Sequence, residues 1–145
     1  MLNKEDIKYE HDKFNFAYRV ASVIYNNDKS KILLFKGKTM NYYMLPGGKV
    51  KELEKSNDAI KREISEEIGW KDLKYKVIGV GEDIIHENNK NIHEITILYE
   101  TVYKNDIIIL KFNGLESNWI GFEWVDIQSL DNYYIHIQNV SLLKS

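Results

Sequence analysis

The sequence of 145 residues contains no cysteine and only one proline. Without cysteine, the chain can form neither a disulfide framework nor a thiolate metal site, which fits a protein of the reducing cytoplasm. The formal net charge of -2 creates no strong field that would favour nucleic acid or a membrane surface. No apolar run reaches the ~20 residues that span a bilayer, and the charged N-terminus lacks the apolar core of a signal peptide. We therefore expect a cytoplasmic protein that binds neither nucleic acids nor membranes.

Hydrophobic residues, by contrast, are plentiful. They make up 43% of the chain, which is enough to build a proper core, and the length fits one domain of ordinary size. No internal repeat, low-complexity segment or linker divides the sequence. We therefore expect residues 1–145 to form a single domain.

Strand-like segments and turns alternate along most of the chain. Two apolar runs, 16–27 and 31–38, flank a polar turn at 26–30 and predict a β-hairpin. The stretch YYMLPGG predicts a short strand that stops at Pro46 and the two glycines. Two glycines in the strand expected at 73–87, Gly79 and Gly81, indicate a bulge or a close backbone approach. Further strands are expected at 93–104, 107–112 and 119–127.

One helix is well marked, from about Ser56 to Ile68. Gly69 occupies its C-terminal cap position, and Ser56 or Asn57 is expected to be its N-cap. A single central helix among many strands predicts a mixed α/β domain.

This helix carries three carboxylates on one face. Glu63, Glu66 and Glu67 stand at spacings of three and four, which stack side chains, and like charges at these spacings cost ~0.2–0.5 kcal/mol per pair. The face lies beside the predicted buried stripe, which consists of Ile60, Ile64 and Ile68. The carboxylates are therefore expected at the edge of the packed face, where a cleft could form.

Two interpretations of the crowded face remain open. It could be a solvated charged surface, because Arg62 can pair with Glu66 or Asp58 at a spacing of four. It could instead bind a hard cation such as Mg²⁺, which takes a few carboxylates and keeps several waters. Glu63 has no basic residue four positions away in either direction, which favours the cation.

The residues before the helix add to the second interpretation. We expect Pro46, Gly47 and Gly48 to form a tight turn with no side chain in the way, so that its backbone groups can contact a metal or a phosphate. A pair of glycines alone is a weak signal. Its distance from the acidic segment REISEE is a much stronger one.

The segment from Gly48 to Trp70 resembles the Nudix box, G-x5-E-x7-R-E-U-x-E-E-x-G-U, in which U is a bulky apolar residue. Every fixed position is filled, by Gly48, Glu54, Arg62, Glu63, Ile64, Glu66, Glu67, Gly69 and Trp70. Many Nudix proteins have a pair such as Pro-Gly before the first glutamate, whereas this chain has Glu52-Leu53. The order of strands around the box, including the segment GFEWVDI, extends the resemblance to most of the chain.

The resemblance implies the Nudix fold, an α/β/α sandwich with a mixed β-sheet. It also implies hydrolysis of nucleoside diphosphates linked to another moiety, with Mg²⁺ or Mn²⁺ as cofactor. Arg62 would orient Glu63, and Gly48 and Glu54 would support the site as groups around the ligands. The implied metal ligands are the Gly47 carbonyl, Glu63, Glu66 and Glu67.

A general base is also needed to deprotonate the attacking water. Glu63 or Glu67 could act from the helix, although a metal ligand is a weakened base. The expected strand at 93–104 offers Glu94 and Glu100 on one face at even spacing. Glu94 is the favoured base because it follows the loop and lies nearer a strand end, and the alternative is a plain exposed carboxylate.

Substrate contacts are expected from residues outside the box. His86 and His93 flank the loop NNKN and could meet across a hairpin to touch a phosphate, although plain surface positions are the alternative. Tyr42 and Trp119 are the candidates for stacking on a base.

The sequence favours nucleoside triphosphates, possibly oxidised ones, as substrates, because the extra motifs of several other Nudix subfamilies are absent. A nucleotide sugar such as ADP-ribose is the alternative substrate. A non-catalytic nucleotide-binding regulator is the alternative from another class, but such proteins usually lose box glutamates. Whether the chain forms a homodimer is left open.

Overall fold

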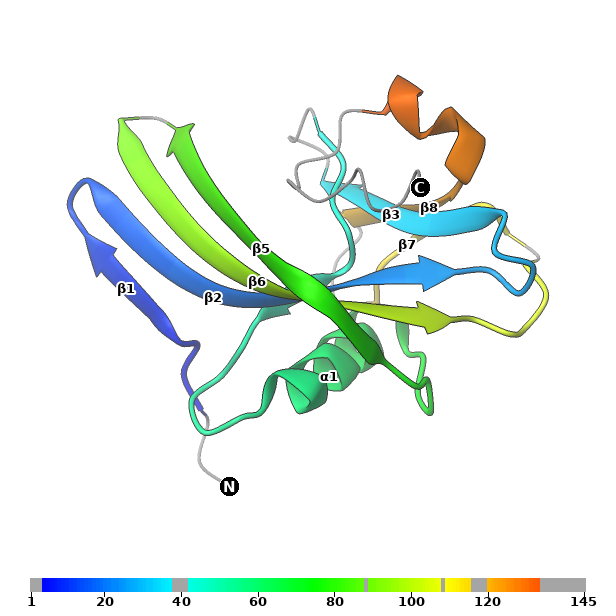
Figure 1. Ribbon diagram of the computed structural model, residues 1–145, viewed down its shortest axis with the longest axis horizontal. Helices are drawn as coiled ribbons and strands as arrows, with labels where there is room; N and C mark the ends of the chain where they lie inside the picture. The colour runs from blue at the N-terminus through cyan, green and yellow to red at the C-terminus, as the bar shows by residue number, and fades with distance from the viewer. Residues whose placement is uncertain (1–3, 38–41, 88, 108, 116–119, 134–145) are drawn as a thin grey trace.

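The structure, a computed structural model, describes residues 4–37, 42–87, 89–107, 109–115 and 120–133. Within these residues one mixed sheet of eight strands holds the fold together (Figure 1). In chain order the elements are β1 Lys8–His11, β2 Phe14–Tyr25, β3 Lys31–Gly37, β4 Gly47–Lys49, α1 Ser56–Ile68, β5 Lys76–Glu87, β6 Lys90–Val102, β7 Lys111–Asn113, β8 Ile120–Asp126 and the 3-10 helix η1 Ile127–Asn132.

The sheet is organised around β2. Its main path runs β5-β6-β2-β3-β8-β7, and β1 and β4 also pair with β2. Strands β2 and β6 are parallel over their whole length, from Phe14 opposite Asn91 to Tyr25 opposite Val102. All other pairs of named strands are antiparallel. The mixed sheet expected for the Nudix fold is therefore present.

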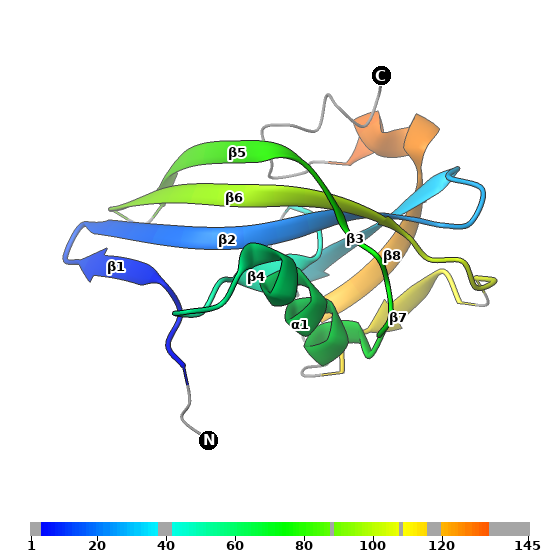
Figure 2. The same cartoon turned by 60° about the horizontal axis from the view of Figure 1, so that its bottom comes forward.

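Helices lie on both faces of the sheet, with α1 on one side and η1 on the other (Figures 1 and 2). The helix-side cluster, which contains Ile60, Ile64 and Ile68 of α1, packs on Val20, Ile24 and Tyr99 among others. The far-side cluster contains Leu130 of η1. Full burial of one such aliphatic side chain stabilises the fold by about 1.5–3 kcal/mol. The isoleucine stripe predicted from the sequence is confirmed.

Most predicted elements are present, with some corrections. The hairpin of β2 and β3 forms around the turn at 26–30, and a register shift in β5 between Val77 and Gly79 confirms the irregularity expected there. Helix α1 ends at Gly69 in the left-handed conformation, as predicted. The predicted N-cap is wrong, because Lys55 takes that position without a side-chain cap and the Ser56 hydroxyl pairs instead with the Tyr99 hydroxyl at 2.6 Å.

The stretch YYMLPGG also differs from its prediction. Pro46 does not end a strand here, because β4 begins immediately after it and contains both glycines. Before it, Met44 makes an isolated bridge with Phe35. Pairing with β2, which lies far away in the sequence, thus overrides the local turn preference of Gly47 and Gly48.

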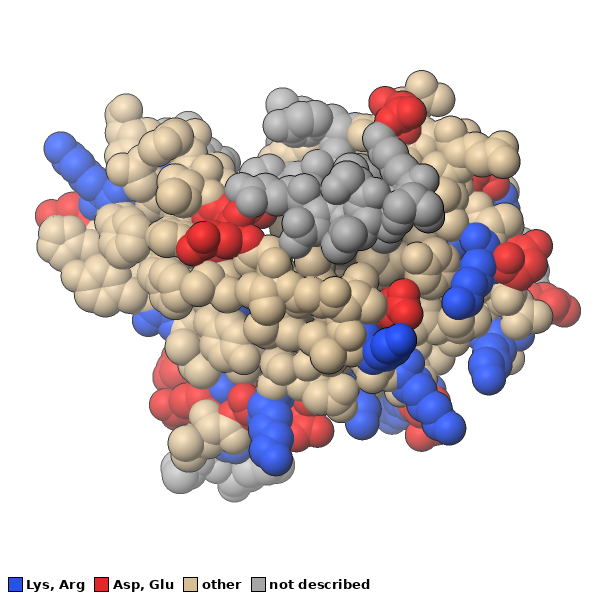
Figure 3. Space-filling view, in the orientation of Figure 1, with Lys and Arg blue, Asp and Glu red and all other residues tan. Residues whose placement is uncertain are grey.

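The charged side chains of the surface are mixed. On the face that Figure 3 shows, acidic and basic groups lie near one another, and uncharged residues cover much of the area between them. None of the helices in the described ranges is long and apolar enough to cross a membrane.

The loop before α1 contains a strained residue. Leu53, which stands where many Nudix proteins have glycine, adopts a φ of 60° and is 92% exposed. A left-handed conformation costs an L-residue ~1–2 kcal/mol, and this exposed side chain recovers none of it by packing. We expect Leu53→Gly to raise the free energy of unfolding by about 0.5–1 kcal/mol, after the entropy cost of glycine is subtracted.

Urea denaturation of the two proteins measures this difference. Glu52→Gly is the matched control, because Glu52 is exposed too but lacks a positive φ, and this variant should lose stability. A loss of stability in Leu53→Gly as well would show that the left-handed backbone is not strained.

Candidate functional site

The edge strand β4 exposes part of its backbone beside α1. The Pro46 carbonyl accepts a hydrogen bond from the Ser22 amide, and the Val50 amide donates to the Tyr18 carbonyl. The backbone groups that bond to β2 therefore belong to the even-numbered residues of the segment 46–50. In an antiparallel ladder the intervening residues direct their amides and carbonyls away from the partner. The Gly47 and Lys49 carbonyls thus point away from β2.

Both glycines of β4 leave space for neighbouring groups and do not serve an unusual backbone conformation. A methyl group on Gly47 would overlap the backbone of Val20 and Ala21. A methyl group on Gly48 would overlap the carboxyl group of Glu63. Neither glycine has a positive φ. The glycine pair therefore lets β4 lie close to β2 and lets the Glu63 carboxylate lie directly against β4.

Arg62 connects the helix, the preceding loop and β4. Its Nε donates to Glu54 Oε2 at 2.7 Å and its Nη2 donates to Glu54 Oε1 at 3.0 Å. Nη2 also donates to the Lys49 carbonyl at 3.0 Å. Nη1 reaches Glu63 Oε1 at 2.9 Å and Glu66 Oε2 at 3.3 Å. One guanidinium therefore fixes the positions of three carboxylates.

The carboxylates of this cluster have unequal surroundings. Burial raises the pKa of Glu63, while hydrogen bonds from the Glu67 and Arg62 side chains act in the opposite direction. Hydrogen bonding by Arg62 lowers the pKa of Glu54. The side chain of Glu63 is 14% exposed and that of Glu66 is 42% exposed. Glu63 is thus the carboxylate with the greatest need of a positive partner.

The fit of this cluster to a divalent cation can be judged from the same contacts. Among the described residues no group of three or more His, Asp or Glu side chains is arranged to hold a metal, and Arg62 holds both Glu63 and Glu66. The donor chemistry nevertheless fits Mg²⁺ or Mn²⁺. The side chains of Glu63 and Glu67 lie close together. The Gly47 carbonyl points away from β2, as does the Lys49 carbonyl that Arg62 binds.

The predicted base, Glu94, does not join this cluster. Side chains alternate along β6, and its odd residues Ile97 and Tyr99 pack in the helix-side cluster while Leu98 packs in the far-side cluster. No register shift interrupts β6 along β2. Glu94 and Glu100 stand at even-numbered positions of β6, like Leu98. Both therefore point to the face opposite α1.

The predicted substrate contacts are dispersed. His86 and His93 do not meet, because His86 Nδ1 pairs with Asn91 Oδ1 and His93 Nε2 pairs with Glu82 Oε2 at 2.9 Å. Tyr42 lies half-buried in the segment before β4. Trp119 lies outside the described residues.

Two contacts around α1 could not be predicted from the sequence. The Lys49 carbonyl binds Arg62, and a backbone acceptor carries no residue-type pattern. The Ser56–Tyr99 hydroxyl pair, which ties the start of α1 to β6, could likewise not be found from spacing.

Comparison with known families identifies one match. A family model described as NUDIX domain matches residues 16–143. No curated protein matches the chain.

Solved structures with the same fold are numerous. The MutT NUDIX hydrolase from Burkholderia pseudomallei has a TM-score of 0.67 at 21% identity, over 89% of this chain and 95% of that one. The dihydroneopterin triphosphate pyrophosphohydrolase of E. coli has a TM-score of 0.65 at 16% identity, over 81% and 85%. The NUDIX domain of Shewanella oneidensis NrtR complexed with ADP ribose has a TM-score of 0.63 at 14% identity, over 88% and 84%. At these identities the likeness shows a shared fold.

Proposed function

Because the chain belongs to the NUDIX domain family, we propose that it hydrolyses nucleoside diphosphate derivatives at a pyrophosphate linkage, by attack of water and with a divalent cation. The family makes the chain a Nudix-type pyrophosphohydrolase. The observation that carries the proposal is the placement of Glu63 against Gly48, with Arg62 bound to its carboxylate and Glu67 beside it.

The chain's own groups account for cation binding. Glu63, Glu67 and the Gly47 carbonyl would hold Mg²⁺ or Mn²⁺, and the more exposed Glu66 would take part from the solvent side. A cation bound there would neutralise phosphate charge and lower the pKa of a bound water. Arg62 keeps Glu63 in place through its bonds to Glu54 and the Lys49 carbonyl, and Gly48 leaves the space that the Glu63 carboxylate needs.

A helix carboxylate is the better candidate for the proton acceptor. Glu94 lies on the face of the sheet opposite α1, whereas Glu63 and Glu67 lie on α1 itself. We therefore propose that Glu67 or Glu63 takes the proton from the attacking water, and keep Glu94 as the hypothesis to be tested against it.

Nucleoside triphosphates are the substrates that we favour. One structural relative, the dihydroneopterin triphosphate pyrophosphohydrolase of E. coli, is named for a triphosphate. ADP-ribose is the alternative, because the NUDIX domain of NrtR binds it. A non-catalytic role is disfavoured, since all the glutamates of the box are retained.

A substrate panel tests the proposal. The purified protein with Mg²⁺ should convert a nucleoside triphosphate, ordinary or oxidised, to the monophosphate and pyrophosphate, and excess EDTA should stop the reaction. Chromatography of the nucleotide products, with ADP-ribose in the same panel, separates the two substrate classes. Binding of nucleotides without turnover of any panel member would contradict an enzymatic role.

A further inference from the structure

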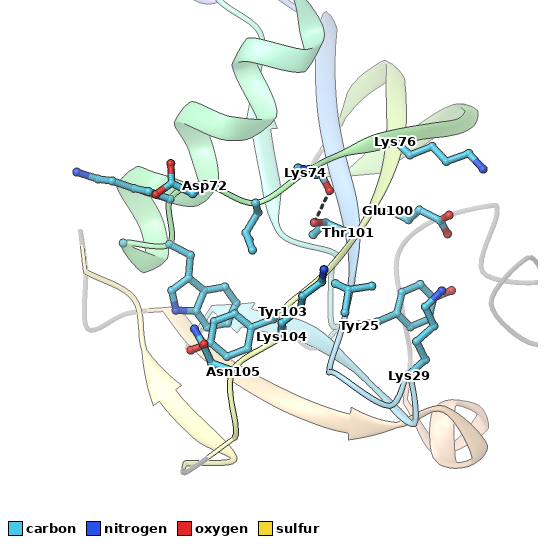
Figure 4. Close-up of a pocket in the computed structure, with 15 residues that line it drawn as sticks. Tyr25, Lys29, Asp72, Lys74, Lys76, Glu100, Thr101, Tyr103, Lys104 and Asn105 are labelled. Carbon is cyan, nitrogen blue, oxygen red and sulfur yellow. Dashed lines mark hydrogen bonds between the residues drawn. The ribbon is translucent and has the colours of Figure 1, made fainter.

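A hollow lies beyond the C-terminal end of α1. It has a volume of about 600 Å³ and is bounded by the end of β2, the turn at Lys29, the segment 69–76 and the end of β6 (Figure 4). Neither Glu63, Glu66 nor Glu67 lines it. The volume lies within the range of small-molecule sites, and the hollow is distinct from the carboxylate site.

Positive charge dominates the wall of this pocket. The lysines that line it come from three of these segments, and they are Lys29, Lys71, Lys74, Lys76 and Lys104. Only two carboxylates, Asp72 and Glu100, accompany them. The excess of three positive charges contrasts with the net charge of -2 for the whole chain.

These lysines are also unpaired. None of the five makes a salt bridge within the described ranges. Lys29 instead lies over the ring of Tyr25, at 5.5 Å from its centroid. The excess of positive charge on this wall would attract an anion into the hollow.

The pocket has a fixed aromatic side. Trp70 stacks on Tyr103 with ring centroids 4.0 Å apart and an angle of 17° between the planes. Trp124 supports Trp70 from within the core, at 6.0 Å. The Thr101 hydroxyl donates to the Lys74 carbonyl at 2.6 Å, which fixes the lysine-bearing segment to β6. The backbone of Lys74 is therefore held in place before any ligand arrives.

We propose that this pocket is a binding site for a small phosphate-bearing anion of the size of pyrophosphate. Lysine ammonium groups bind phosphate oxygens as point charges, and the aromatic side removes water from one flank of the ligand. The dimensions of the hollow favour a small polyanion over an extended nucleic acid.

Calorimetric titration with inorganic pyrophosphate, in EDTA so that no divalent cation bridges it to the carboxylate site, tests the proposal. The parent should bind one pyrophosphate per chain. The double variant Lys71→Ala/Lys104→Ala, which removes two exposed side chains, should weaken binding by at least ~10-fold, because each charge-assisted hydrogen bond contributes strongly. Lys71→Arg/Lys104→Arg should retain binding.

The control variant Lys13→Ala/Lys90→Ala removes the same charge at the start of β2 and of β6, outside the pocket. It should leave the affinity within about two-fold, since charges separated by more than a Debye length are largely screened. Chemical shifts of the Trp70 indole should move on titration. Absence of pyrophosphate binding, equal weakening in the control variant, or tighter binding of a single-stranded oligonucleotide than of pyrophosphate would each overturn the proposal.

Discussion

Replacing Glu67 by glutamine is expected to lower kcat by ~10²–10⁴-fold, which is the rate acceleration that a general base typically provides. The amide keeps the size of the carboxylate but loses its charge, so it neither takes a proton nor attracts a cation well. Because the change removes like-charge repulsion against Glu63 and Glu66, the melting temperature measured in EDTA should hold or rise. Steady-state kinetics with Mg²⁺ and thermal melts of parent and variant provide the two measurements.

Glu94→Gln is the matched control for this experiment. It makes the same chemical change on the face of the sheet opposite α1, and kcat should stay within a few-fold of the parent. If Glu94→Gln lost as much activity as Glu67→Gln is expected to lose, the base would be Glu94, as the sequence predicts. A fully active Glu67→Gln enzyme would contradict the assignment of the helix carboxylates to the chemistry.

Replacing Arg62 by alanine should have the largest effect on stability, with a loss of about 2–4 kcal/mol in the free energy of unfolding. The side chain is 21% exposed, and its removal strands Glu54 and Glu63, which are 13% and 14% exposed. It also removes the partner of the Lys49 carbonyl. Lys61→Ala is the control, because Lys61 is an exposed neighbour on the same helix and should change stability little.

The pH dependence provides an internal check. Arg62 lowers the pKa of Glu54 below its ordinary value of 4.5. A carboxyl with a lowered pKa stabilises the folded state above its unfolded pKa, and this contribution disappears as the pH falls through the folded value. The difference in stability between parent and Arg62→Ala should therefore be full near neutral pH and shrink in acid. A difference that grew in acid would contradict the pairing of Arg62 with Glu54.

The sequence alone determined those features that depend on local spacing. The period of the isoleucines placed the buried face of α1, and Gly69 marked the end of the helix. The same helical geometry places Glu63, Glu66 and Glu67 on one edge of the buried face of α1, whatever the fold around the helix. These features survive because neighbouring positions on one helix have fixed relative directions.

Only the tertiary structure decided the features that depend on strand pairing. Gly47 and Gly48 resemble a turn in the sequence, but they lie in a strand because β2, more than twenty residues earlier, provides the partner. Likewise, the sequence does not decide which face of the sheet Glu94 lies on, and the register of β6 against β2 places it on the face opposite α1. A shift of one residue reverses every side chain of a strand, and the register is set by contacts between segments distant in the chain.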